Sequence, residues 1–367
     1  MIKSILKNKI SVLIIAALIS GGGFFGCGSD SPIIPSSGNP SDLSRTGKFI
    51  SFTSNLDGDY DIYIIQVDAN GNIATTGLVY TTNPYNLTNT FNANTDKQSN
   101  WSPDGRVLVY SSTQGNNEEV YAFFFKADGG IDSSITPNPK MLFSSNGNWD
   151  NNPSYSPDGN YLIWDRRYDN NNNAQVDSAD ARDLYIGDIV GSGSSLHVQD
   201  IHAIVTTSGK DEYNPKWSPR ISTRKIAYEY QSSSTATDHD VYIIDPFDTT
   251  NTNYVFYNPN NSGYPAWAPE CNRIIFESDK SQGDFWKIVS LNYPTNSGQP
   301  TDIAQESNVH LRYPTWLPNG NLLAYIRITP SSGNGNIYII NSSGGTPFKL
   351  LQSQPQFDNA NNLWPAW

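Results

Sequence analysis

The sequence of 367 residues contains little of the side-chain chemistry from which most enzyme and metal sites are built. It has two cysteines, two methionines and four histidines, and only 16% of its residues are charged. The histidines follow no metal-ligand spacing, and neither a Gly-x-Ser-x-Gly elbow nor a glycine-rich phosphate loop occurs. These absences argue against a zinc enzyme, a serine hydrolase and a nucleotide-dependent enzyme.

Long hydrophobic runs are also missing, apart from a short one near the N-terminus. Three lysines precede an apolar stretch over residues 10–19, and a glycine-rich segment then leads to Gly26-Cys27. The stretch is shorter than the roughly 20 residues that a membrane-spanning helix needs, and this anatomy is typical of a secretory signal. Gly26-Cys27 resembles a bacterial lipobox, so we predict a signal peptide over 1–26 and lipidation of Cys27. The alternative is ordinary secretion with a chance cysteine.

Residues 27–47 are rich in Ser, Pro, Gly and Asp and cannot bury a core, which predicts a flexible tether between lipid and domain. More than one acyl chain on the cysteine would give stable anchoring. The residue directly after Cys27 is Gly28 and not Asp, and by resemblance to well-studied envelopes this favours the outer membrane over the inner one. The domain itself is predicted to span 48–367.

The charge balance of the chain is acidic. Removal of residues 1–26 takes away three lysines and no acid, which lowers the formal net charge from −12 to −15. This argues against nucleic acid and anionic membrane surfaces as partners, so membrane contact is expected only through the lipid anchor. Beyond Cys27 the only cysteine is Cys271, which excludes an internal disulfide of the mature chain and a cysteine metal site. We expect Cys271 to be a half-buried bystander.

One short box recurs along the chain. It reads Asn100-Trp101-Ser102-Pro103-Asp104-Gly105 and Ser154-Tyr155-Ser156-Pro157-Asp158-Gly159, and it returns in altered form around Trp217, Trp267 and Trp316. Its aromatic positions are separated by 54, 62, 50 and 49 residues. Pro-Asp-Gly is a turn sequence, and a short apolar strand follows every box. A second strand opens after each, as at Glu119, Asp183, Asp240, Asp284 and Asn336. This period suits one blade of a β-propeller.

The two ends of the chain complete the count of blades. Residues 48–54 and 61–65 match the two strands that follow a box, yet no box precedes them. The chain ends in Asn362-Leu363-Trp364-Pro365-Ala366-Trp367, which is the start of a box with nothing after it. We therefore predict an all-β, six-bladed propeller of four-stranded blades, in which the C-terminal strand completes the first blade and closes the ring.

The box and the strand after it resemble the WD-repeat-like propeller repeat of the TolB family, over about 48–367. The resemblance implies a propeller whose channel mouth is a binding surface, which in TolB receives a peptidoglycan-associated lipoprotein. TolB also has an N-terminal α/β domain, and this chain has only a short predicted tether at that place.

An Asn-rich segment between two predicted strands of the third blade fits the spacing of a twelve-residue calcium loop. Ala174 replaces the usual Gly of the loop, and Asp180 replaces the bidentate Glu. The alternative is a solvated Asn-rich loop. The predicted role of one Ca²⁺ is structural, and its oxygen ligands would come from Asp169, Asn171, Asn173, the Gln175 carbonyl, Asp177 and Asp180.

The residues just before each box form the second candidate site, a rim around the central channel. Acidic and amide groups on one arc would face aromatic groups on the other, which suits a peptide, a glycan or a protein tip. The alternative is that these groups only cap strands and turns. The predicted rim consists of Asp96, Gln98, Asp150, Asn152, Glu212, Asn214, Tyr264, Tyr313 and Trp364.

These patterns together predict a monomeric, non-catalytic lipoprotein of the cell envelope that binds a protein or glycan through its channel face. The alternative from another class is a carbohydrate-active lyase that acts on an oligosaccharide in the channel. Such a lyase needs a cluster of His, Arg and Gln with a metal, and only His239 and His310 are placed to contribute.

Overall fold

The computed structural model describes residues 49–68, 71–89, 94–114, 117–232, 238–256, 261–279, 285–294 and 299–366. The predicted signal peptide, the predicted tether and Cys27 lie outside the described residues. Within the described ranges, no helix has the length and apolar character that crossing a membrane requires.

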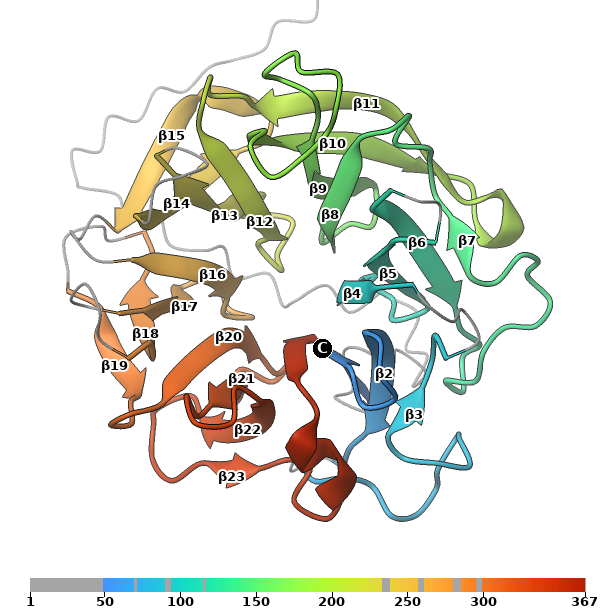
Figure 1. The fold of residues 1–367 in the computed structure, drawn as a ribbon, viewed down its shortest axis with the longest axis vertical. Coiled ribbons are helices and arrows are strands. Elements are labelled where there is room, and N and C mark those ends of the chain that lie inside the picture. The colour runs from blue at the N-terminus through green and yellow to red at the C-terminus, as the bar shows by residue number, and fades with distance from the viewer. Residues whose placement is uncertain are drawn as a thin grey trace, which may run out of the picture.

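In these ranges the strands form six four-stranded antiparallel sheets arranged as blades around a common centre (Figure 1). The predicted all-β, six-bladed propeller is therefore confirmed. The innermost strands of the blades are β24, β4, β8, β12, β16 and β20, and adjacent ones contact one another around the ring.

Each blade in the first half of the ring runs outward from its innermost strand. Blade 1 consists of β24 (Asn362–Ala366), β1 (Phe49–Ser54), β2 (Asp61–Gln66) and β3 (Tyr85–Asn86). Blade 2 consists of β4 (Asp96–Trp101), β5 (Val107–Ser112), β6 (Glu119–Phe124) and β7 (Lys140–Met141). Blade 3 consists of β8 (Trp149–Tyr155), β9 (Tyr161–Arg167), β10 (Arg182–Val190) and β11 (His197–Val205).

The second half of the ring follows the same plan. Blade 4 consists of β12 (Asp211–Trp217), β13 (Ile226–Gln231), β14 (His239–Asp245) and β15 (Asp248–Phe256). Blade 5 consists of β16 (Ser262–Trp267), β17 (Arg273–Ser278), β18 (Lys287–Asn292) and β19 (Thr301–Ala304). Blade 6 consists of β20 (His310–Trp316), β21 (Leu322–Ile328), β22 (Gly335–Asn341) and β23 (Phe348–Lys349). Two short 3₁₀ helices, Gly193–Ser195 and Pro355–Asn359, lie in connections.

The ring closes where the two ends of the chain meet in blade 1. Strand β24 pairs antiparallel with β1, as the sequence predicts. The Ser54 hydroxyl donates to Asn362 Oδ1 at 2.8 Å, and Asn362 Nδ2 donates to the carbonyls of Gly335 and Phe357 at 2.8 and 2.9 Å. Asn362 is fully buried, so one amide side chain links the first, last and intervening segments of the closure.

The Ser-Pro-Asp-Gly box forms the tight turn between the first two strands of a blade. In blade 2, the Ser102 hydroxyl donates to Asp104 at 2.6 Å and accepts from the Val107 N–H at 2.9 Å. Gly105 has φ 69° and donates its N–H to the Ser102 carbonyl at 2.9 Å. The left-handed backbone that this turn requires explains the glycine.

Cys271 occupies the same turn position in blade 5. Its φ is 58°, and its N–H donates to the Ala268 carbonyl at 2.9 Å, as Gly105 does to Ser102. The side chain is fully buried, so the expectation of a half-buried residue is wrong. The sequence also places the start of the next strand too early, because β18 begins at Lys287; the predicted first residue, Asp284, lies outside the described residues.

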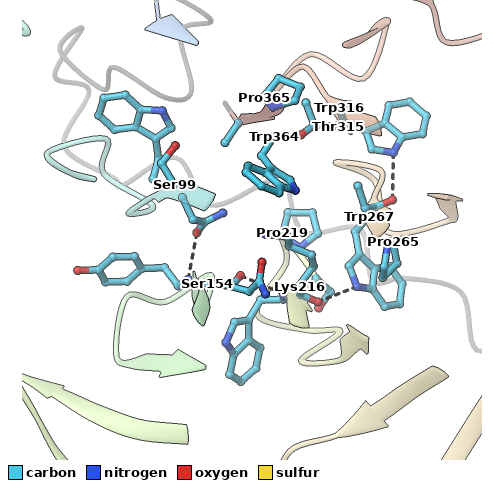
Figure 2. Close-up of a pocket in the computed structure, with 18 of the residues that line it drawn as sticks. Ser99, Ser154, Lys216, Pro219, Pro265, Trp267, Thr315, Trp316, Trp364 and Pro365 are labelled. Carbon is cyan, nitrogen blue, oxygen red and sulfur yellow. Dashed lines mark hydrogen bonds between the residues drawn. The ribbon is translucent and has the colours of Figure 1, made fainter. Parts of the chain in front are cut away.

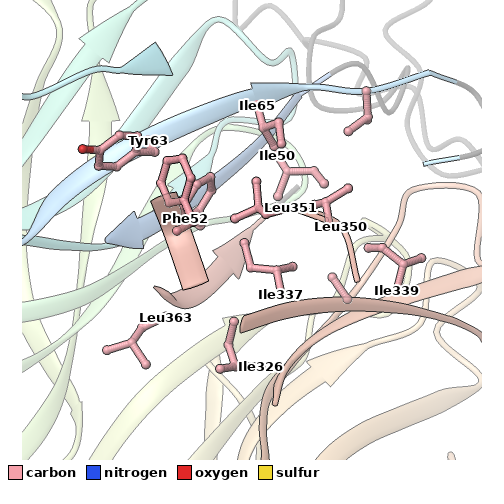
Figure 3. Packing of buried hydrophobic residues seen from close by; sticks show 13 residues of the cluster. Ile50, Phe52, Tyr63, Ile65, Ile326, Ile337, Ile339, Leu350, Leu351 and Leu363 are labelled. Carbon is pink, nitrogen blue, oxygen red and sulfur yellow. The ribbon is translucent and has the colours of Figure 1, made fainter. Parts of the chain in front are cut away.

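Six hydrophobic clusters form the core, and each lies between two adjacent blades. Between blades 1 and 6, Ile50, Phe52 and Ile65 pack against Ile326 and Ile337 (Figure 3). In blades 2 to 6 the box aromatic enters the cluster shared with the preceding blade, as Trp101, Tyr155, Trp217, Trp267 and Trp316 show. Both faces of every blade are thus covered by neighbours.

Replacement of Asn362 by Ala should destabilise the closure of the ring. The change leaves buried carbonyls and the Ser54 hydroxyl without a partner, which should cost about 3 kcal/mol of the free energy of unfolding. Urea unfolding followed by tryptophan fluorescence measures this. As a control, Asn334→Ala removes one exposed hydrogen bond to the Asn359 carbonyl and should cost less than about 0.5 kcal/mol. Equal stabilities of the two variants would contradict the role of Asn362.

Candidate functional site

A cavity of about 380 Å³ lies at the centre of the ring, between the inner strands and the box turns (Figure 2). Its lining is aromatic residues, prolines, amides and hydroxyls from all six blades. Lys216 is the one charged residue among the described residues that line it. Its size and mixed lining are typical of a small-ligand or peptide-end pocket.

Each blade contributes one residue with a left-handed backbone to this cavity. These residues stand three positions before the box aromatic, and in each the inner strand bulges, so that its register with the next strand shifts there. Side chains of a regular strand alternate between the two faces of the sheet. A bulge interrupts this alternation, and here it turns the side chain toward the channel. The six residues and their φ values are Gln98 (58°), Asn152 (53°), Asn214 (51°), Tyr264 (49°), Tyr313 (54°) and Trp364 (45°).

All six belong to the rim that the sequence predicts, and the structure brings them together around one cavity. None of them is glycine, so each carries a backbone cost of about 1–3 kcal/mol that the surrounding structure must offset. Five are followed directly by proline, which the sequence shows at 153, 215, 265, 314 and 365.

Buried carboxylates on the second strands of blades 3, 4 and 5 hold three of these positions in the following blade. Each accepts a hydrogen bond from the backbone N–H of the left-handed residue. Asp165 accepts from Asn214 at 3.2 Å, Glu229 from Tyr264 at 3.0 Å, and Glu277 from Tyr313 at 2.8 Å. The corresponding strand positions in blades 1, 2 and 6 are Thr53, Ser111 and Ile326.

The side-chain amides join the same carboxylates. Asn152 Nδ2 donates to Asp165 at 2.7 Å, and Asn214 Nδ2 donates to Glu229 at 2.9 Å. Burial raises the pKa of Asp165 to about 6, although Arg182 and the Asn152 amide act in the opposite direction. The side-chain nitrogens of Asn152 and Asn214 are therefore used within the protein.

Aromatic rings form the opposite arc of the cavity. Tyr264 and Tyr313 meet edge to face with their centroids 4.5 Å apart, and Tyr313 lies 5.5 Å from Trp364. The guanidinium of Arg312 lies 5.2 Å from the Tyr313 ring and forms an ion pair with Glu277 at 2.6 Å. These contacts fix the rings in place before any ligand binds.

Lys216 is the residue just before the box aromatic of blade 4. The matching residues in the other blades are neutral: Asn100, Ser154, Ala266, Thr315 and Ala366. Burial lowers the pKa of Lys216 to about 8, and the Asp165 carboxylate opposes this only in part. Among the described residues, no side chain forms a hydrogen bond or ion pair with its ammonium group.

The predicted rim residues Asp96, Asp150 and Glu212 do not line the cavity, and this part of the prediction is corrected. They precede the bulge, so they keep the normal alternation and are buried within their own blades. Asp150, for example, accepts two hydrogen bonds from the Arg166 guanidinium, at 2.6 and 2.9 Å.

The histidines that a lyase would use lie outside the cavity lining. His239 Nδ1 lies 2.9 Å from Glu229 Oε1 and also contacts the Tyr213 hydroxyl. Burial lowers the pKa of His239, but the hydrogen bond and charge of Glu229 outweigh it and raise the pKa overall. Burial and Arg312 lower the pKa of His310. The pKa values of the two histidines thus shift in opposite directions, and among the described residues the two share no group that could hold a metal ion.

The loop predicted to bind calcium uses its oxygens to accept its own backbone N–H groups. Asp180 is fully buried and accepts from Asn170, Asn171 and Asp177 at 3.0–3.3 Å, and Asp169 accepts from Asn173 at 2.9 Å. Among the described residues, the carboxylates of this loop do not gather into a group that could share an ion. Calcium binding at this loop remains a prediction.

The hairpin between β1 and β2 carries a different acidic group that the sequence analysis missed. One carboxylate oxygen from each of Asp57, Asp59 and Asp61 lies within 4.8 Å of the others, so this group could hold a metal ion. Asn86 Nδ2 donates to Asp57 at 3.0 Å and to Asp61 at 2.8 Å. Burial raises the pKa of Asp61 to about 6. In the sequence, the Asp-x-Asp-x-Asp spacing of these residues is the feature that could have indicated this group.

A second cavity of about 220 Å³ adjoins the first, because Gln98 and Asn152 line both. Its charged lining residues are largely paired. Lys97 forms an ion pair with Glu118 at 2.5 Å, and Arg182 pairs with Asp211, which is not part of the lining, at 3.2 Å.

Comparison with known proteins identifies the fold. TolB from Acinetobacter baumannii superposes with a TM-score of 0.60 at 15% identity, over 88% of this chain and 67% of that one. The chain has the TolB-like β-propeller fold. The protein assigned as TolB in Agrobacterium tumefaciens gives a TM-score of 0.51 at 16% identity, over 70% of this chain and 80% of that one.

The chain is also similar in structure to an enzyme. An oligogalacturonate lyase in complex with manganese gives a TM-score of 0.52 at 15% identity, over 83% of this chain and 74% of that one. No protein-family model and no curated protein sequence matches the chain. Identities this low show the fold and leave the function to the site.

The free energy of unfolding should fall as the pH rises from about 5 to about 8. Burial raises the pKa values of Asp96 and Glu212 to about 7, from 3.8 and 4.5. The folded state therefore holds more protons in this interval, and the stabilisation is complete at low pH and lost as the pH rises through 7. Urea unfolding at several pH values measures the slope.

Asp96→Asn and Glu212→Gln should each flatten this slope. Asp200→Asn, which neutralises an exposed acid, should leave it unchanged. A slope that is the same in all four proteins would show that the two buried acids are ionised to the same extent in both states.

Proposed function

We propose that this chain is a non-catalytic binding protein of the bacterial cell envelope, and that its central cavity binds a protein segment or a glycan. The observation that carries the proposal is the convergence of six left-handed, non-glycine residues on one cavity. Backbone strain of this kind persists where the rest of the structure enforces it, and it concentrates at ligand sites.

The chemistry of the cavity supports binding. Tyr264, Tyr313 and Trp364 offer rigid aromatic surface, and Figure 2 shows the Trp364 indole projecting among the other lining side chains. Tyr and Trp dominate the energetics of binding surfaces because they contribute large contact areas at little entropic cost. A ligand end inserted here would meet aromatic residues on one side and amide residues on the other.

The predicted lipid anchor supports a place in the envelope. Lipidation of Cys27 and the tether over 27–47 would hold the propeller near a membrane, the outer one rather than the inner one. The propeller would then act as a monomeric scaffold at that surface and bind its partner in the central cavity.

A lyase is the second candidate, favoured by the likeness to oligogalacturonate lyase. Two groups that could act on a sugar already have partners, since His239 contacts Glu229 and Arg312 pairs with Glu277. Incubation with oligogalacturonate and manganese, followed by ultraviolet absorbance of unsaturated products, tests this. We expect no turnover; turnover lost in His239→Ala would establish the lyase instead.

Calcium is a cofactor expectation that this function does not require. Thermal unfolding with and without Ca²⁺ tests it on the intact chain. A stabilisation lost in Asp169→Asn would place the ion in the loop that the sequence predicts. One lost in Asp59→Asn would place it in the β1–β2 hairpin, which the gathering of three carboxylates favours.

Substitution of Trp364 should weaken partner capture. Full-length protein in detergent is immobilised and exposed to envelope extract, and retained protein and glycan are identified. Trp364→Ala should reduce the amount retained about tenfold or more, because a central aromatic anchor is lost. Trp149→Ala, in the second cavity, is the matched control and should retain the wild-type amount. Equal loss in both variants, or no partner for the wild type, would contradict binding through the central cavity.

A further inference from the structure

The central cavity contains one charge and no counter-charge. Lys216 lines it, and no carboxylate does so among the described residues. In a chain with a net charge of −12, a lone, half-buried cation needs an explanation. Removing a charge from water is costly unless the charge is paired, and this desolvation lowers the pKa of the ammonium group to about 8.

The five matching strand positions show that packing does not require a lysine. They carry Asn, Ser, Ala, Thr and Ala, and all are compatible with the same inner strand. The backbone carbonyl of Lys216 accepts from Trp267 Nε1 at 3.2 Å, a contact that any residue could supply. Trp316 Nε1 makes the same contact with the carbonyl of Ala266. The ammonium group is therefore a feature of the cavity rather than of the fold.

Five further lining residues carry a buried polar side-chain atom that forms no hydrogen bond: Gln98 Oε1, Trp101 Nε1, Tyr155 Oη, Trp217 Nε1 and Trp364 Nε1. All five side chains are neutral, so the Lys216 ammonium is surrounded by neutral groups. A carboxylate that pairs with it must therefore come from a ligand.

We propose that the cavity binds the C-terminal end of a peptide or protein, with Lys216 as the counter-charge to its terminal carboxylate. A peptide C-terminus carries a single carboxylate, which matches the single ammonium group of a cavity otherwise lined by aromatic, amide and other neutral residues. A polyuronate carries a carboxylate on every sugar, but the cavity holds one cation in an acidic protein, so a polyanion is disfavoured. This inference rests on the proposed function and names the ligand of that same site.

The test uses two peptide mixtures and the full-length chain immobilised in detergent. Both are N-acetylated hexapeptides randomised at their last four positions, one with free C-terminal carboxylates and the other with C-terminal amides. Retained peptides are quantified by mass spectrometry. We expect about tenfold or more greater retention of the free acids, the usual value of a charge-assisted contact.

Variants at Lys216 assign the effect to its charge. Lys216→Met should remove the preference for free acids, and Lys216→Arg should keep part of it. Arg106→Met removes an exposed cation and should leave the preference intact. In the wild type the preference should also fall as the pH rises through about 8, where Lys216 loses its proton. The carboxylate that acts on Lys216 is Asp165, which keeps its charge throughout that range.

Two outcomes would overturn the inference. Equal or absent retention of acids and amides, while envelope extract still yields a partner lost in Trp364→Ala, would leave the proposed function and refute carboxylate recognition. Retention of a glucuronate-containing disaccharide that depends on Lys216, without retention of peptides, would show that the carboxylate belongs to a glycan. Absence of any partner from extract as well would refute the proposed function itself.

Discussion

The packing of each blade against two neighbours is the interaction on which the rest of the structure depends. Among the described residues, every hydrophobic cluster lies between two blades, and none lies within a single blade. A sheet with two apolar faces is stable only when both are covered, which an open row of blades cannot achieve at its ends. Closure of the ring through β24 and β1 is therefore a condition of folding, and the central cavity is a by-product of that closure.

A second constraint, the bulge in each inner strand, determines which side chains line the cavity. The bulge turns one residue per blade toward the centre, and Asp165, Glu229 and Glu277 hold three of these residues by their backbone N–H groups. Because the backbone is held, the side chain at the position is free to vary. Amides occupy the arc of blades 2 to 4 and aromatic residues the arc of blades 5, 6 and 1, so one scaffold presents two kinds of surface.

The sequence predicts the fold well because its evidence is periodic. The boxes at Trp101, Tyr155 and Trp316 recur in phase, and the unmatched ends predict closure. Of the nine residues that the sequence predicts for the rim, six line the cavity. Asp96, Asp150 and Glu212 do not, because they precede the bulge in their strands, and no local sequence pattern reveals that bulge. The sequence does not single out Lys216, because this lysine stands out only among the neutral residues that line the cavity with it. The gathering of Asp57, Asp59 and Asp61 depends on a hairpin whose geometry the spacing alone does not define.

The position of β1 has a mechanical consequence. It is the first described strand, yet it lies second in its blade, hydrogen-bonded to β24 on one side and to β2 on the other. A pull on the chain ahead of Phe49 would load both ladders along the strand axis, so their hydrogen bonds would have to break together in shear rather than one after another. Resistance of this kind is governed by the unfolding rate. When the propeller is pulled from this end, the force acts across the β24–β1 pairing that closes the ring, while the cavity stays assembled.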